Sequence, residues 1–210
     1  RILALSDEAV EAIQTAKDRQ MLRLGTTVTL ALSLVPRALS GFAARHPEIQ
    51  IHISCDRSDA LLAQLETDDI DIAFMMDQGK QPGRRFVHSQ PLVWVSGAGF
   101  DAAAHQAVPL AFLADGRDLR HYAFAALDGA GRQGNIAHLS QHPIGVRAFV
   151  QSGLAVTVMP RSTVAPPLQI LDDASGLPPL SSVALSAYHQ IGKADEPVEF
   201  LLTLLEEAAR

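Results

Sequence analysis

The chain has 210 residues and a hydrophobic content of 48%, which is enough for one large or two small domains with a buried core. Its formal net charge is −6 and its Lys and Arg residues are scattered, which argues against a free-standing nucleic-acid binder. A single cysteine, Cys55, excludes a disulfide within the chain, and with no signal peptide or membrane-length apolar run, a cytoplasmic location is expected.

The first twenty residues predict an amphipathic helix. Leu3, Leu5, Val10 and Ile13 approximate one apolar stripe, with charged residues elsewhere. Such a helix fits either a connector to a segment upstream of Arg1 or an ordinary packing helix, and periodicity alone does not separate the two.

Strands and helices alternate in the next part of the chain. Strands are predicted at Met21–Leu24, Ile49–Cys55 and Ile70–Met75. Helices are predicted at Leu30–Arg45, interrupted near Pro36, and at Ser58–Thr67. This alternation predicts right-handed crossovers and a mostly parallel sheet, that is, an α/β fold.

A second α/β unit is predicted after a strand at residues 86–96, where Pro91 marks an edge or crossing point, and a loop at Gly97–Ala107. The remaining predicted strands are Pro109–Leu113, Asn135–Ser140, Leu154–Met159 and Val183–Tyr188. The remaining predicted helices are Leu119–Leu127, Ile144–Ser152 closed by Gly153, and Glu196–Ala209.

Ligands of open α/β sheets bind beyond the carboxyl ends of the parallel strands. The residues at these ends are Thr26, Thr27 and Thr29; Asp56, Arg57, Ser58 and Asp59; Met75, Met76 and Asp77; and, in the second unit, Ser140, Gln141 and His142. Thr29 and Ser58 fall at predicted helix N-termini, where a hydroxyl and backbone N–H groups meet. The alternative for each is simple N-capping, a stabilisation of about 1 kcal/mol.

Several other side chains allow two interpretations each. Arg57 offers a charged fork for a carboxylate, although a solvated surface arginine is the more common role. A core role is favoured over a place in a pocket wall for Trp94 and for at least one of Met75 and Met76. Cys55 is expected to be a buried, inert thiol. Asp71 is expected to satisfy backbone donors rather than to abstract protons.

The sequence carries no pattern of a metal, cofactor or catalytic site. His138 and His142 stand four apart, but Pro143 breaks a helical pair, and H-E-x-x-H and C-x-x-C are absent. G-x-S-x-G, G-x-G-x-x-G and the phosphate-binding loop are absent as well. We therefore expect neither an enzyme nor a resident metal or cofactor.

The segments "LRLG", "LVPRALSGFAARHPEIQIHI", "LLAQLETDDIDIAF", "PLVWV" and "VQSGLAVTVMP" together resemble the effector-binding region of LysR-type transcriptional regulators. The resemblance covers about residues 21–210. Gly25, Pro36 and Phe42 followed by Pro47 match the family pattern, and Gly153–Pro160 matches a later element loosely.

The resemblance implies a fold similar to type-2 periplasmic binding proteins: two α/β lobes joined by two crossing strands, with an effector in the cleft between the lobes. It implies lobe I at 21–95 and 162–210, lobe II at 96–161, and the end of a linker helix at 1–20. It implies effector contacts at Thr29, Ser58 and Met76 and in the loop around Ser140–His142. Together with two residues from the strand ends, the predicted effector-binding residues are Thr27, Thr29, Arg57, Ser58, Met76, Ser140 and His142. Several relatives carry a polar or basic residue where Met76 stands, which points to a less charged effector or to a contact supplied elsewhere.

The resemblance also implies partners: a homodimer or homotetramer formed through Leu30–Arg45 and Ile49–Ser54, and promoter DNA read by a winged helix-turn-helix absent from this chain. No membrane partner is expected. Two alternatives stay open, a stand-alone solute-binding protein and, with less support, an enzyme on the same fold.

Overall fold

The computed structural model describes residues 21–115, 117–192 and 194–210. The helix predicted within residues 1–20, including its interpretation as a linker, lies outside the described residues. The chain divides into two compact units. The first unit consists of three segments: the chain up to Thr27, residues Val35–Phe86 and residues Ser186–Arg210. The second unit consists of Val28–Leu34 and Val87–Leu185.

Two strands pass from one unit into the other. The boundary between Phe86 and Val87 falls within β4 (Arg84–Ser96), and the boundary between Leu185 and Ser186 falls within β9 (Ser182–His189). The lobe ranges implied by the resemblance, 21–95 with 162–210 and 96–161, stay a prediction.

The first unit is built on parallel strands. β1 (Met21–Thr26) pairs in parallel with β2 (Gln50–Cys55) on one side and with β3 (Ile72–Met76) on the other. The sheet order then continues from β3 to β9 and β4. The predicted parallel sheet is therefore confirmed in this unit, and the carboxyl ends of β1, β2 and β3 share one edge.

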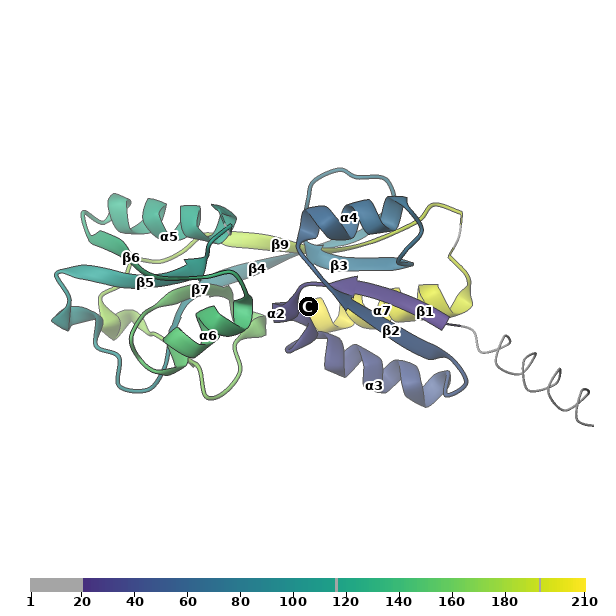
Figure 1. Cartoon of the computed structure of the whole chain (residues 1–210), viewed down its shortest axis with the longest axis horizontal. Coiled ribbons are helices and arrows are strands. Elements are labelled where there is room, and N and C mark those ends of the chain that lie inside the picture. Colours follow the sequence, from purple (N-terminus) through teal and green to yellow (C-terminus); the bar gives the residue numbers. More distant parts are fainter. Residues whose placement is uncertain (1–20, 116, 193) are drawn as a thin grey trace, which may run out of the picture. The chain divides into compact units, whose positions relative to one another are not determined.

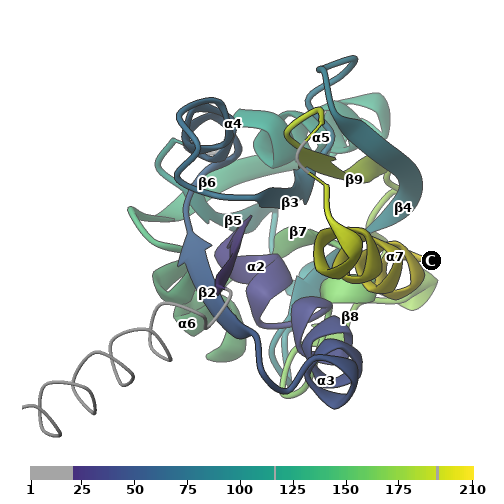
Figure 2. The ribbon, with the colours of Figure 1, turned by 90° about the vertical axis from the view of Figure 1, so that its right-hand side faces the viewer.

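Helices cover both faces of this sheet (Figure 1; Figure 2). α4 (Ser58–Glu66) packs against β1 and β3 on one face, and α3 (Val35–Arg45) lies beside α7 (Glu196–Ala209) on the other. The core under α4 consists of Leu61, Leu65, Ile70, Ala73, Met75 and Tyr188. Met75 is completely buried, which agrees with the prediction that at least one of Met75 and Met76 has a core role.

α7 begins where the sequence predicts because its start carries three helix signals. The Asp195 side chain accepts a hydrogen bond from the Val198 N–H, Pro197 stands in the first turn, and Glu196 and Glu199 complement the positive end of the helix dipole. Burial of an apolar stripe then holds the helix on the sheet; its buried residues are Val198, Leu201, Leu202, Leu205 and Ala209.

The second unit contains β5 (Ala107–Leu113) and β6 (Gln133–Ser140), which pair in parallel. α5 (Arg117–Gly129) and α6 (Pro143–Gln151) pack against these strands. β7 (Thr157–Pro160) and the short β8 (Gln169–Ile170) pair antiparallel with β4. The Trp94 side chain is 4% exposed and its indole N–H donates to the Pro178 carbonyl at 2.7 Å, so the predicted core role is confirmed.

The predicted interruption near Pro36 is confirmed, but it separates two helices, α2 (Val28–Ala31) and α3. Pro36 lies in the first turn of α3, where its missing N–H costs no helical hydrogen bond. The predicted loop at Gly97–Ala107 contains a 3-10 turn at Ala102–Ala104 that the Asp101 side chain caps.

Two predictions from the sequence are wrong. The strand expected at Leu154–Met159 begins only at Thr157, and Leu154 is 57% exposed. Cys55, expected to be buried, is exposed because it ends β2, the strand at the edge of the sheet. Partial burial nevertheless raises the pKa of the Cys55 thiol, so exposure does not make it a reactive thiolate.

Candidate functional site

The candidate site in the first unit lies at the carboxyl edge of its parallel strands. The register aligns Thr26 of β1 with Cys55 of β2 and with Phe74 of β3. The Thr26 hydroxyl donates to the Phe74 carbonyl at 2.8 Å, and the Asp56 N–H donates to the Thr26 carbonyl at 3.1 Å. This edge therefore brings together the segments that carry Thr27, Arg57 with Ser58, and Met76, three stretches far apart in the sequence.

The start of α4 supplies backbone donors at this edge. Arg57 is the N-cap residue with extended backbone, but its side chain makes no capping bond, and Ser58 is the first helical residue. In the described part of the chain no protein partner for the hydroxyls of Thr27 or Ser58 is seen, and both residues are half-buried. A helix N-terminus with two such hydroxyls is suited to a hydrogen-bond acceptor on a ligand.

The charged groups beside Ser58 are paired with each other. The Arg57 guanidinium donates to both carboxylate oxygens of Asp59, from Nε at 3.2 Å and from Nη2 at 2.8 Å. The hydrogen bond from Arg57 lowers the pKa of Asp59. Asp56 accepts from the backbone N–H of Arg57 at 2.8 Å and from the Gln64 amide at 3.2 Å. This pairing leaves less of the Arg57 fork for a carboxylate ligand than the sequence suggested.

The residue after Met76 is the centre of a polar network. Asp77 Oδ1 accepts from the Ser186 hydroxyl at 2.6 Å and from the Tyr188 hydroxyl at 2.7 Å. Arg84 Nη1 lies 3.2 Å from both carboxylate oxygens, and the Gly79 N–H donates to Oδ2 at 3.2 Å. The sequence placed Asp77 at a strand end but did not single it out, because Ser186 and Tyr188 lie 109 and 111 residues further along the chain.

The remaining three candidates belong to the second unit. Thr29 is the second residue of the short α2, and its carbonyl accepts from the Ser33 hydroxyl at 2.7 Å. The Ser140 hydroxyl, at the end of β6, donates to the His142 carbonyl at 2.8 Å and accepts from the His142 N–H at 3.1 Å. His142 caps α6, with Nδ1 accepting from the Ile144 N–H at 3.3 Å. These contacts form the start of α6 and leave the His142 ring exposed.

The family model described as "LysR substrate binding domain" matches residues 15–210. The chain belongs to this family. The HTH-type transcriptional regulator DgdR of Burkholderia cepacia is 32% identical over 187 residues, which cover 89% of this chain and 63% of that protein. The HTH-type transcriptional regulator PecT of Dickeya dadantii is 25% identical over 180 residues, which cover 86% of this chain and 57% of that protein. This chain thus spans less than two thirds of both relatives.

The fold of this LysR substrate-binding domain is shared with solved structures. The C-terminal domain of a probable LysR family transcriptional regulator from Rhodococcus sp. RHA1 superposes with a TM-score of 0.65 at 21% identity, covering 89% of this chain and 98% of that one. The predicted α/β fold similar to periplasmic binding proteins is confirmed. The family itself is the one that the resemblance indicated.

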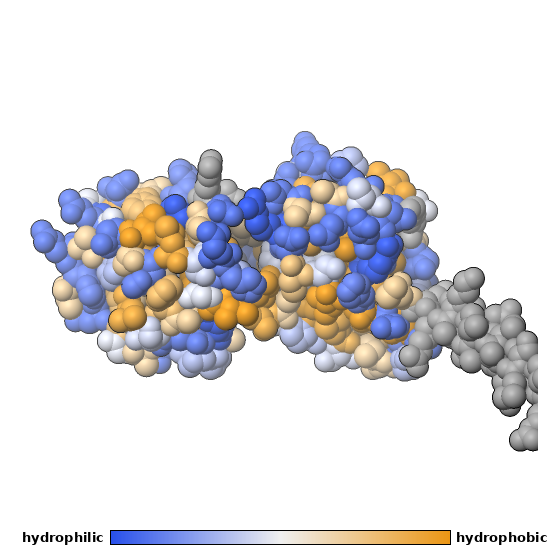
Figure 3. All heavy atoms as spheres, viewed as in Figure 1, coloured by the Kyte–Doolittle hydropathy of each residue, from blue (hydrophilic) through white to orange (hydrophobic). Residues whose placement is uncertain are grey.

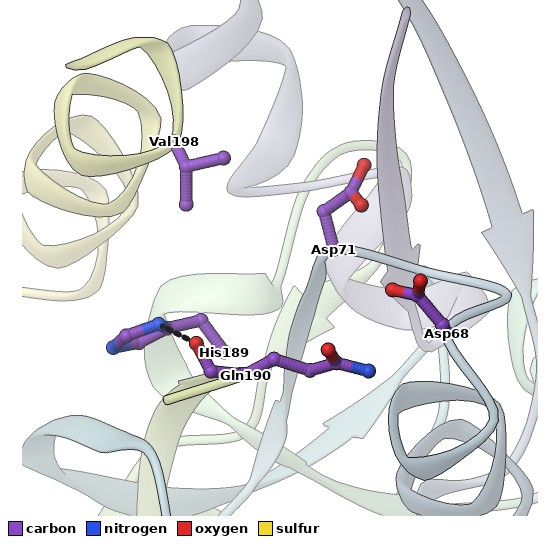
Figure 4. A pocket seen from close by; sticks show the side chains of 5 residues that line it. All are labelled: Asp68, Asp71, His189, Gln190 and Val198. Atoms are coloured by element: carbon purple, nitrogen blue, oxygen red, sulfur yellow. Dashed lines mark hydrogen bonds between the residues drawn. The ribbon is translucent and has the colours of Figure 1, made fainter. Parts of the chain in front are cut away.

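A small open hollow lies elsewhere on the first unit of this LysR domain (Figure 4). Its lining residues are Asp68, Asp71, His189, Gln190 and Val198, none of which the sequence analysis proposed as a ligand contact. Asp71 is engaged with Arg23, whose backbone N–H donates to Oδ2 at 2.7 Å, so the expected role in satisfying a backbone donor is confirmed.

Within residues 21–115, 117–192 and 194–210, no group of three or more His, Cys, Asp or Glu side chains has the arrangement to hold a metal ion. Nor does any helix in these ranges combine the length and the apolar character of a membrane span.

Proposed function

We propose that this LysR substrate-binding domain senses a small-molecule effector and passes the signal to a DNA-reading part of a longer transcriptional regulator. The observation that carries the proposal is the family match over residues 15–210, together with two relatives that are named HTH-type transcriptional regulators. These relatives are regulators rather than enzymes, and we propose that this chain likewise has no catalytic activity.

The effector site we propose lies in a cleft between the two lobes and uses the seven residues that the sequence indicated. The carboxyl edge of the first unit supports this proposal through the N-terminus of α4 and the hydroxyls of Thr27 and Ser58. Because Arg57 is paired with Asp59, we expect the effector to present hydrogen-bond acceptors here rather than to rely on a free guanidinium.

The signal we propose is a shift between two arrangements of the lobes. An effector changes this equilibrium only by its difference in affinity for the two arrangements, about tenfold for each 1.4 kcal/mol. The changed arrangement then alters how an oligomer presents its DNA-reading domains. Promoter DNA, read through a winged helix-turn-helix absent from this chain, and a cytoplasmic location both follow from this proposal.

The homodimer or homotetramer we propose uses α3 and β2. β2 is the edge strand of its sheet, and the Ile53 side chain on it is 37% exposed. Apolar surface is visible beside β2 and α3 (Figure 3). An exposed strand edge with apolar side chains is suited to pairing with a second copy.

The experiment that tests the effector site is a thermal-shift screen against a library of small metabolites. A compound that binds the folded chain raises the melting temperature in a concentration-dependent way. We expect the double variant Thr29→Ala, Ser58→Ala to lose the shift for every active compound while its own melting temperature stays close to that of the wild type.

The matched control is the double variant Ser152→Ala, Thr203→Ala. These two exposed hydroxyls donate to the Phe149 carbonyl in α6 and to the Glu199 carbonyl in α7. This control should respond to the same compounds as the wild type. If the Thr29→Ala, Ser58→Ala variant still responds fully, the site is not where we propose it.

A further inference from the structure

The Asp77 carboxylate bonds to both strands that run from one unit into the other. Ser186 and Tyr188 reach it from β9, and Arg84 reaches it from the first position of β4. Ser186 is the first residue of the first unit after the boundary in β9, and Arg84 lies just before the boundary in β4. One carboxylate therefore holds the two strands at the point where each leaves the first unit.

The network is partly buried, and several donors converge on the one carboxylate. The Asp77 side chain is 16% exposed and that of Arg84 is 25% exposed. The Tyr188 hydroxyl also accepts the Gln78 N–H at 2.8 Å, which ties the loop after β3 to the same group. Loss of the carboxylate leaves these donors without their acceptor in a poorly hydrated place, a larger penalty than loss of a surface contact.

The chain before β4 and the end of β9 approach each other closely beside this network. Gly83, directly before β4, has φ +75°, and a Cβ atom placed on it would overlap the His189 carbonyl oxygen. The His189 N–H donates to the Gly83 carbonyl at 3.0 Å. The chain thus uses a glycine where only a residue without Cβ allows this contact.

We propose that Asp77 is a positioning residue that fixes β4 and β9 at the unit boundary and thereby restricts the motion of the two units relative to each other. The inference rests on the proposed function in one respect. Met76, a proposed effector contact, directly precedes Asp77, so an effector bound at Met76 would act next to the carboxylate that holds β4 and β9.

The test measures the distance between the units without any ligand. Nitroxide labels are attached to Ala63→Cys on α4 and Ala125→Cys on α5, both exposed helical positions, in a Cys55→Ser background. Double electron–electron resonance is recorded on labelled protein diluted with unlabelled protein, so that only distances within one chain are detected. We expect Asp77→Asn to broaden the distance distribution about twofold.

Two milder variants and one control complete the test. Ser186→Ala and Tyr188→Phe each remove one donor and keep the carboxylate, so each should broaden the distribution less than Asp77→Asn. Asp71→Asn weakens a bond between β1 and the start of β3, within the first unit, and should leave the width unchanged.

An unchanged width in Asp77→Asn, or equal broadening in Asp71→Asn, would overturn the proposal. If Asp77→Asn does not fold, unchanged widths in both Ser186→Ala and Tyr188→Phe overturn it instead. Because no effector is added, these outcomes are independent of the thermal-shift result, and the two proposals fail separately.

Discussion

Asp71 holds both the backbone and the side chain of Arg23. Asp71 Oδ2 accepts the Arg23 N–H at 2.7 Å, and Oδ1 lies 2.6 Å from Arg23 Nη2. The two side chains are 24% and 28% exposed. This hydrogen bond raises the pKa of the Arg23 guanidinium further, so Arg23 stays charged throughout the accessible pH range. With a further bond from Arg23 Nε to Oδ2 at 3.3 Å, three charge-assisted hydrogen bonds attach the start of β3 to β1.

We predict that Asp71→Ala lowers the free energy of unfolding by about 2 kcal/mol, since a hydrogen bond to a charged group contributes roughly 1.5–3 kcal/mol. Urea denaturation followed by circular dichroism measures the change. Asp69→Ala, an exposed carboxylate in the same turn, is the matched control and should change stability much less. Equal effects of the two substitutions would mean that the Asp71–Arg23 contact does not stabilise the fold.

The stability that Asp77 provides should depend on pH. Burial by itself raises the pKa of Asp77, but hydrogen bonds from Ser186, Tyr188 and Arg84 outweigh it and lower the pKa below its ordinary value. A carboxyl group with a lowered folded-state pKa stabilises the protein above its unfolded-state pKa of about 4 and loses this contribution as the pH falls through the folded-state value.

The stability difference between the wild type and Asp77→Asn should therefore be largest near neutral pH and shrink as the pH falls below about 4. Urea denaturation of both proteins at a series of pH values measures the difference, and the other carboxyl groups affect both proteins alike. A difference that stays constant down to pH 3 would show that Asp77 does not act through its charge.

Gly25 is predicted to be intolerant of a methyl group. A Cβ atom at this position would overlap Ile70 Cδ1 and lie 2.8 Å from Leu61 Cδ2, in the buried layer between β1 and α4. Because these are side-chain ends that can shift, we expect Gly25→Ala to cost about 1–3 kcal/mol of unfolding free energy.

Gly129→Ala is the matched control, because no atom lies within 4 Å of a Cβ at the end of α5. Alanine is favoured over glycine in a helix, so this variant should be neutral or slightly stabilising. Circular dichroism on urea denaturation is again the measurement, since Trp94 fluorescence reports on the second unit alone. A neutral Gly25→Ala variant would show that the glycine is not required for packing.

Sequence patterns predict an element correctly where the residues that determine it lie within a few positions of each other. The predicted α7 bounds coincide with the observed Glu196–Ala209 because capping and apolar periodicity act within one helix. The strand edges carrying Thr27, Ser58 and Met76 were predicted for the same reason: strand–helix alternation implies parallel pairing, which aligns their carboxyl ends.

Local patterns did not predict that Cys55 is exposed or that β7 begins only at Thr157. Whether β2 is an edge or a central strand depends on sheet order, and its alternating sequence fits either position. The ion pair of Arg57 with Asp59 is a different case, because the two residues are only two apart and the sequence analysis did not consider their pairing.

The α/β fold and the order of its elements could be predicted from the amino-acid sequence because hydrophobic periodicity and helix capping are local properties, and the family followed from the resemblance of several short segments. That Asp77 joins β3 to β4 and β9 became evident only in the folded chain. Its hydroxyl partners lie more than one hundred residues away, and the strength of a partly buried carboxylate network depends on which donors the folded chain brings within hydrogen-bond distance.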